Sequence, residues 1–285
     1  MNLKKILMVF LLLLAASFDA QAELDFGQEV LVIPDTHNEK PYIWNVQVNP
    51  HEYELILEPG QPLAGEPADF GFSINSKSGE AIGDLHVFIT DKELHAYKHI
   101  KPEFNNGRYR FVYNAPWAGK YRIEAVFNAG NGWINLRKDI NVKGRRAGHE
   151  AFGHEDDKGY SVKAKLIPRK IYAEHVVTVL YELSYNGTPI KGLEKIGGTD
   201  MQVAAWDEDL KEFIYATSKQ NLGGPEVAVS FVFMRPGKHA IFAEFKHNGI
   251  VRKVDLVVNV YEEPQHQSSG GSESSGVRDL RPSDG

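Results

Sequence analysis

The sequence predicts an all-β protein that consists of two tandem immunoglobulin-like antiparallel β-sandwiches. Three observations lead to this fold class. Short runs rich in Val, Ile, Phe and Tyr are separated by Gly, Pro, Asn and Asp, which is the pattern of strands and turns. About seven such runs occur in each stretch of roughly 100 residues, as expected of an immunoglobulin-like sandwich. The second stretch also repeats the pattern of the first.

The first 22 residues have the features of a secretory signal peptide. Lys4 and Lys5 precede an apolar run over residues 6–16, and Ala20-Gln21-Ala22 is the small-x-small motif that a signal peptidase cleaves. The apolar run is shorter than the ~20 residues of a membrane-spanning helix, which disfavours the alternative of an uncleaved anchor. We therefore expect an exported protein, periplasmic or secreted, that begins near Glu23 and keeps no transmembrane anchor.

The composition argues against several classes of function. The chain has no Cys, so we expect no disulfide, thiol nucleophile or Cys-ligated metal. Its net charge of −6 argues against nucleic acid as a partner. The Gly-x-Ser-x-Gly, P-loop and dinucleotide-binding motifs do not occur. We therefore expect a protein that is not an enzyme and has no cofactor other than a metal ion.

The first sandwich is predicted over residues 51–143, after an N-terminal extension over residues 23–50 that is a candidate for one further strand. In residues 121–127, Tyr, Ile, Ala and Phe alternate with positions that begin with Arg and Glu, so one strand face should be buried and the other wet. The strands of this sandwich are expected at residues 53–58, 68–76, 85–90, 95–100, 108–114, 120–128 and 134–142.

The second sandwich is predicted over residues 159–262. Residues 144–158 are polar, charged and contain Gly, and they are expected to form a linker. Residues 263–285 are dominated by Ser, Gly, Glu and Asp, which cannot bury a core, and they are predicted to be a disordered tail. The strands of this sandwich are expected at residues 160–167, 176–185, 201–206, 212–217, 227–234, 239–246 and 251–260.

The two copies match best at an Asp-x-x-Leu segment and at the strand that starts with Gly-Lys. Asp91–Leu94 corresponds to Asp207–Leu210, and Gly119–Phe127 corresponds to Gly237–Phe245, with offsets of 116 and 118 residues. Such a duplication makes each copy a control for the other. Features of both copies are expected to be scaffold, whereas features of one copy are candidates for function.

Histidines gather on the predicted hairpin around Asp91–Leu94 of the first copy. A four-residue loop places His86 opposite His99 and Thr90 opposite His95, all on one face, because side chains alternate with period two. Residues directly opposite each other have Cβ atoms about 4.5–5.5 Å apart, close enough for two imidazoles to share a metal ion. We therefore predict His86 and His99 as metal ligands, with His95 at the rim.

Other interpretations of this hairpin stay open. A three-residue loop would place Leu85 opposite His99 and separate the histidines. The histidines would also suit the wet face of an edge hairpin, because metal-bound imidazoles usually have further ligands and orienting partners, and the sequence indicates none. The second copy has Gln202, Lys211 and Tyr215 at the equivalent positions, so the fold does not require the histidines.

A longer stretch around the hairpin matches a family pattern. It comprises His86 to Glu103, with Asp91-x-x-Leu94 and His99-x-Lys101-Pro102, followed by Gly107-x-Tyr109 and Pro116-x-x-Gly119-x-Tyr121. This stretch resembles the YtkA-like exported β-sandwich domains over most of residues 53–143 and, in weaker form, residues 160–260. Lys101 stands where that family has a second His. The resemblance implies a metal-related accessory role near copper handling.

The predicted linker contains a second pair of histidines, His149 and His154. Their spacing of five exceeds the zincin His-Glu-x-x-His by one residue, and the nearby Gly148 and Gly153 disfavour a helix, so we do not predict a protease. Together with the neighbouring carboxylates they are a weaker alternative metal site. The alternative is a solvated charged loop without a ligand.

The main prediction is an exported accessory protein that binds or delivers a metal such as copper through the first sandwich. The alternative is a protein–protein interaction or adhesion module, in which the sandwiches present edges or loops to an envelope protein. A carbohydrate-binding module would need exposed aromatic faces. The candidates for such faces are Trp44, Trp117, Trp133 and Trp206, although large aromatics more often belong to cores.

Overall fold

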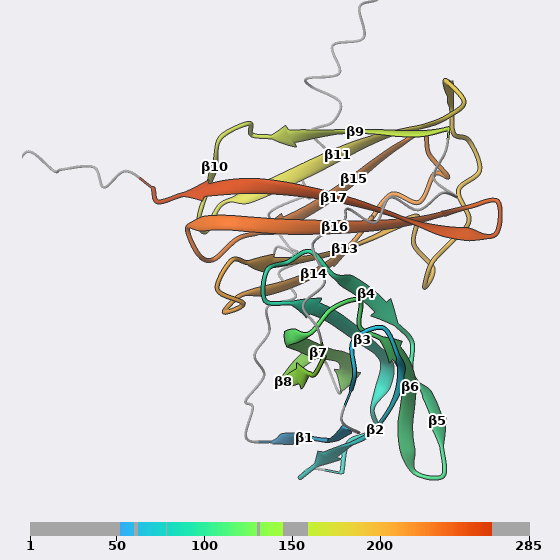
Figure 1. The fold of residues 1–285 in the computed structure, drawn as a ribbon. Coiled ribbons are helices and arrows are strands. Elements are labelled where there is room, and N and C mark those ends of the chain that lie inside the picture. The colour runs from blue at the N-terminus through green and yellow to red at the C-terminus, as the bar shows by residue number, and fades with distance from the viewer. Residues whose placement is uncertain (1–51, 60–61, 78, 130–131, 145–158, 264–285) are drawn as a thin grey trace, which may run out of the picture. The chain divides into compact units, whose positions relative to one another are not determined.

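The computed structural model describes residues 52–59, 62–77, 79–129, 132–144 and 159–263. Within these residues all regular elements are β-strands, arranged as two antiparallel sandwiches (Figure 1). The predicted fold class is therefore confirmed. None of the described residues belongs to a helix long and apolar enough to cross a membrane. The predicted signal peptide, the N-terminal extension, Trp44, His149, His154 and the tail from residue 264 lie outside the described residues.

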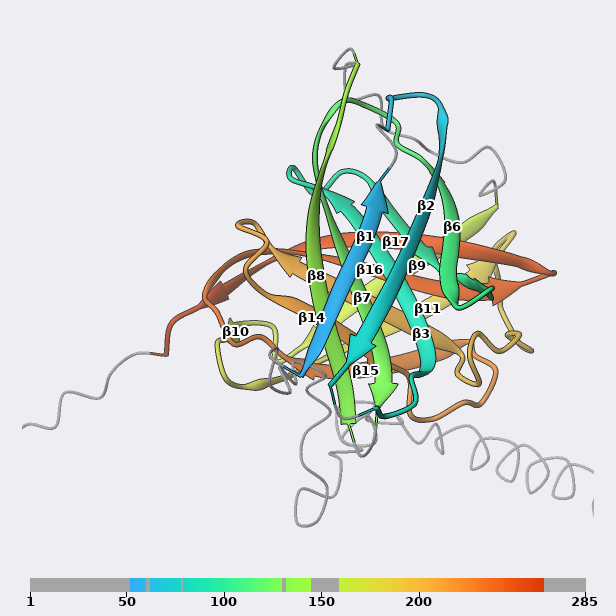
Figure 2. The same ribbon diagram turned by 90° about the horizontal axis from the view of Figure 1, so that it is seen from below.

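The first sandwich consists of two four-stranded sheets, in the orders β1-β2-β6-β5 and β4-β3-β7-β8. Figure 1 labels all eight strands, and Figure 2 shows six of them from below. The inward faces of the two sheets form a core that includes Phe72, Val87, Ile123 and Phe127. The strands are β1 (Tyr53–Pro59), β2 (Pro67–Ser76), β3 (Gly83–Asp91), β4 (Tyr97–Ile100), β5 (Glu103–Asn105), β6 (Arg108–Asn114), β7 (Gly119–Ala129) and β8 (Gly132–Val142).

The second sandwich has a five-stranded sheet in the order β10-β17-β16-β13-β14, and a sheet in which β11 pairs with β9, β12 and β15. All its strand pairs are antiparallel except β10 with β17. The strands are β9 (Tyr160–Ile167), β10 (Ile171–Tyr172), β11 (Val176–Tyr185), β12 (Thr188–Pro189), β13 (Met201–Asp207), β14 (Phe213–Thr217), β15 (Glu226–Val232), β16 (Gly237–His247) and β17 (Ile250–Tyr261). All predicted strands are present, whereas β5, β10 and β12 were not predicted.

The duplicated Asp-x-x-Leu segment forms the same turn in both copies. The Oδ1 atom of Asp91 accepts the backbone N–H groups of the residues four and five positions further along, both at 2.7 Å. Asp207 does the same at 2.6 and 2.8 Å. Leu94 and Leu210 both have a left-handed backbone, with φ of 60° and 57°. The segment is therefore scaffold, as the duplication predicted.

The outer face of the sheet formed by β3 and β7 is buried, contrary to the predicted wet face. Glu124 has no exposed surface, although alternation placed it in water. The reason is that side chains of the second sandwich cover this face. The ring of Phe88 lies 5.4 Å from that of Phe213, and Tyr97 stacks on Phe242 at 4.6 Å. The described residues of both sandwiches belong to one compact unit.

Candidate functional site

The predicted register of the histidine hairpin is wrong by two residues. In the structure Thr90 lies opposite Tyr97, and Phe88 lies opposite His99. The cause is the carboxylate of Asp91, which binds two backbone N–H groups and so keeps residues 92–96 in the turn. The second strand of the hairpin therefore begins at Tyr97.

His86 and His99 nevertheless meet, because they are diagonal neighbours on the same face of the sheet. The Nδ1 atom of His86 lies 2.8 Å from the Nε2 atom of His99. His86 is 1% exposed, so the alternative in which these histidines decorate a wet face is wrong. The two rings are packed among aromatic side chains of both sandwiches, including Phe88 and Tyr215.

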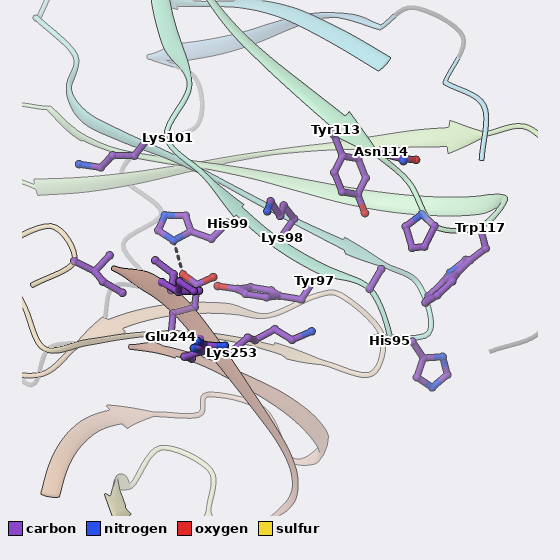
Figure 3. A pocket seen from close by; sticks show the side chains of 16 residues that line it. His95, Tyr97, Lys98, His99, Lys101, Tyr113, Asn114, Trp117, Glu244 and Lys253 are labelled. Atoms are coloured by element: carbon purple, nitrogen blue, oxygen red, sulfur yellow. Dashed lines mark hydrogen bonds and ion pairs between the residues drawn. The ribbon is translucent and has the colours of Figure 1, made fainter. Parts of the chain in front are cut away.

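Carboxylates hold the other nitrogen of each ring. The Nε2 atom of His86 lies 3.2 Å from an oxygen of Asp84, and the Nδ1 atom of His99 lies 2.7 Å from an oxygen of Glu244 (Figure 3). The second oxygen of Asp84 accepts a hydrogen bond of 2.7 Å from Lys101. The result is a continuous chain of hydrogen bonds from a surface lysine, through both imidazoles, to a carboxylate of the second sandwich.

The hydrogen bonds of this chain require one proton more than two neutral imidazoles carry. An ionised carboxylate only accepts, so each outer ring nitrogen donates. The two inner nitrogens would then face each other with lone pairs at 2.8 Å, unless a further proton lies between them. With that proton, the net charge of the chain of hydrogen bonds is zero. The negative charges of Asp84 and Glu244 balance the positive charges of Lys101 and the histidine pair.

Burial lowers the pKa of His86 to about 4, and the charge of the adjacent His99 lowers it further in the same direction. The hydrogen bond to Asp84 opposes both effects. The pKa of Asp84 is itself lowered, because the hydrogen bonds from Lys101 and His86 outweigh the cost of its partial burial. Burial therefore favours the neutral form of His86.

The donor set of the pair suits a metal ion that accepts few ligands. Metal-bound histidines usually donate their other N–H to a carboxylate, as both rings do here. No cluster of three or more His, Asp or Glu suited to a metal occurs in the described part of the chain. The two nitrogens lie 2.8 Å apart, which is a hydrogen-bond distance and leaves room for a proton between them. A metal ion bound to both would need two metal–nitrogen bonds of about 2.0 Å each and thus more space. A metal ion and the shared proton would therefore compete for one place.

The site combines residues of both copies, and each of them differs from its equivalent in the other copy. His86 and His99 are in the first copy, and Glu244 is in the second. Their equivalents in the other copy are Gln202, Tyr215 and Val126. Sequence reasoning missed Glu244 because its separation of 145 residues from His99 leaves no local signal. Asp84 was detectable, since it lies two residues before His86 on the same strand.

The other sequence candidates do not join the pair. The exposed side chain of His95 lies at the far end of the pocket from His99 (Figure 3). Trp117 and Trp206 are buried, and Trp133 packs against Tyr215 at 5.9 Å. The described tryptophans therefore form no exposed platform for a sugar.

A family model described as a domain of unknown function, DUF8832, matches residues 155–262, which include the second sandwich. No curated protein matches the chain. The matched family adds no activity to the geometry above.

Several solved structures match the chain at low similarity. Red sea bream transglutaminase is 15% identical, with a TM-score of 0.25 over 74% of this chain and 32% of that one. The bacterial integrin-binding protein invasin is 16% identical, with a TM-score of 0.25 over 74% and 39%. Escherichia coli alpha-2-macroglobulin is 12% identical, with a TM-score of 0.28 over 75% and 16%. The chain thus spans less than two thirds of each, and scores this low carry no argument about function.

Proposed function

We propose that this protein is an exported, non-enzymatic accessory protein that holds a copper ion between His86 and His99. The observation that carries the proposal is the convergence of two ring nitrogens whose rings are each oriented by a carboxylate. Such second partners fix the ring orientation and raise the basicity of the ligand nitrogen. The resemblance of residues 53–143 to YtkA-like domains supports the same role.

The number of ligands favours copper over zinc. Structural zinc sites are almost always four-coordinate, and the pair offers two imidazole nitrogens. Imidazole also suits copper, and monovalent copper accepts two nitrogen ligands. The ion would be cargo that the protein binds and passes on, while Asp84 and Glu244 orient the two rings. No reaction of a substrate is part of this role.

Calorimetric titration of copper into the mature chain, from Glu23 to Gly285, tests the proposal. We expect one site per chain, lost in the His86→Ala/His99→Ala variant and kept in the control His175→Ala, which removes an exposed histidine elsewhere. Binding should also weaken as pH falls, because the ion displaces the shared proton. Copper retention at one ion per chain in the double variant would refute the proposal.

A role as an interaction or adhesion module of the cell envelope is the second candidate. One observation favours it: among the described residues, strand β4 has one edge that pairs with no other strand, and β17 pairs on its outer edge only through Val260 and Tyr261, with β10. Unpaired edges are templates for a strand of another protein. Crosslinking in intact cells should then retain an envelope protein on the exported chain, and a monomer that retains none would count against this role.

A further inference from the structure

A pocket of about 630 Å³ lies beside the histidine pair, with His99 and Glu244 in its wall (Figure 3). Its charge is opposite to that of the whole chain, which is −6. Glu244 is the one carboxylate among the described residues that line it, and that carboxylate is hydrogen-bonded to His99. The cationic lining residues are Lys98, Lys101, Arg252 and Lys253.

The lysine charges at this pocket are only weakly compensated. Lys98 is exposed, and no carboxylate within the described residues forms an ion pair with it. Lys253 lies over the rings of Tyr97 and Phe242, at 5.9 and 5.8 Å, and its cross-strand neighbour Glu244 is hydrogen-bonded to His99. Lys101 pairs with Asp84, but both side chains are about half exposed, and such surface pairs are weak. An anionic ligand therefore gains attraction here without displacing a buried partner.

Two open strand edges border the same pocket. Strand β4 pairs only with β3 among the described strands. On its outer side, β17 pairs with β10 only through its last two residues, so the outer edge of residues 250–259 is open. Residues 97–99 of β4 and 250–253 of β17 line the pocket. Open edges offer backbone N–H and C=O groups to an extended peptide.

We propose that this pocket binds an acidic, extended segment of a partner protein. The segment adds as a strand to an open edge, and its carboxylates meet Lys98, Lys101 and Lys253. A peptide is favoured over an acidic glycan because the edges supply backbone hydrogen bonds, while Trp117 in the pocket wall is 4% exposed and offers no stacking face. Nucleic acid is disfavoured by the net charge of the chain.

Fluorescence anisotropy with a labelled octapeptide of alternating Glu and Val tests this proposal. The full mature chain is used in the presence of a copper chelator. We expect saturable binding that weakens at least tenfold in Lys98→Glu/Lys253→Glu and stays within twofold in Lys165→Glu/Lys238→Glu, a control that changes the net charge equally. Lys165 of β9 and Lys238 of β16 are exposed lysines outside the pocket. An equal loss in the control would show a net-charge effect and overturn the proposal.

Two further probes separate the parts of the proposal. A peptide that is N-methylated at alternate residues cannot pair fully with a strand edge, so it should bind more weakly than the unmodified peptide. Equal binding of both peptides would overturn strand addition. If heparin displaces the peptide and binds more tightly than the peptide does, the pocket would instead be assigned to glycans. Peptide binding should persist in His86→Ala, which removes a proposed copper ligand that does not line the pocket, so failure of peptide binding is distinguishable from failure of the copper proposal.

Discussion

At the scale of single residues, the histidine pair lies between the two sandwiches, packed among aromatic side chains. His86 is buried, and it contacts His99 through one nitrogen and Asp84 through the other. A second protonation of the pair would remove the acceptor of their shared hydrogen bond and place two positive charges side by side. The stability of the protein should therefore depend on pH through His86.

We expect His86 to destabilise the fold at acid pH. Its pKa falls from 6.5 to about 4 on folding, so between these values the unfolded chain binds more protons. The contribution of His86 to the free energy of unfolding is therefore highest above pH 6.5 and decreases as pH falls toward 4. At 1.36 kcal/mol per pKa unit, the total decrease is about 3 kcal/mol. Urea unfolding from pH 4 to 7 should show this slope, and His86→Gln, which copies the Gln202 of the second copy, should flatten it.

Glu124 affects the pH dependence of the free energy of unfolding in the opposite direction. The contribution of His86 is therefore measured as the difference between the wild type and His86→Gln. Neither of its carboxylate oxygens has a hydrogen-bond partner in the described part of the chain. Burial raises its pKa from 4.5 to about 7, against the attraction of Arg137 and Arg122. Its contribution to stability is thus present below pH 4.5 and lost as pH rises to 7. An acid slope equal in wild type and His86→Gln would contradict the assignment to His86.

At the scale of elements, the Asp-x-x-Leu turn connects β3 with β4 in the first copy and β13 with β14 in the second. Asp91 accepts the backbone N–H groups of His95 and Ala96 through one oxygen and the indole N–H of Trp117 through the other. Asp91 is itself 1% exposed, so these donors have little access to water. The same turn sets the register that brings His99 beside His86.

Asp91→Ala should lower the free energy of unfolding by about 3 kcal/mol or more, because each buried donor left without a partner costs about 1–3 kcal/mol. Asp91→Asn is the matched control, since an amide oxygen still accepts the two backbone N–H groups. Urea denaturation at pH 7 measures both. Equal losses in the Ala and Asn variants would show that the charge, and not the turn hydrogen bonds, stabilises this hairpin.

At the scale of the whole molecule, the apolar contacts between the sandwiches should make their unfolding cooperative. Phe88 has no exposed surface and lies 5.4 Å from Phe213 and 5.1 Å from Tyr215. Burial of a large apolar side chain contributes about 1.5–3 kcal/mol. The side chains that form this interface include Val126, Trp206, Leu210 and Phe242 in addition to those three.

We expect one calorimetric unfolding transition for the wild-type chain. Phe88→Asp places a charge against the aromatic rings of the second sandwich and should separate the transition into two. Phe104→Asp is the control, since Phe104 is 64% exposed and belongs to β5, outside this interface. Two transitions in the wild-type chain, or a single one in Phe88→Asp at unchanged temperature, would contradict the coupling.

Local patterns in the sequence were sufficient for the fold class, the strands and the duplication. Strand alternation and turn residues act over a few neighbours, and such interactions are the same in any tertiary context. They also placed His86 and His99 on one face, because side chains alternate along a strand. The paired Asp-x-x-Leu segments identified the scaffold turn in the same way.

Tertiary structure alone decided the rest. The register depends on where the Asp91 carboxylate finds its donors, and period-two alternation does not encode a shift of two residues. The burial of Glu124 and His86 depends on a second sandwich that covers a face which alternation marks as wet. Glu244 reaches His99 only because folding brings together residues 145 positions apart. The sequence by itself therefore determined which residues form most of the strands, whereas the packing of one sheet face on another determined which of them form the site.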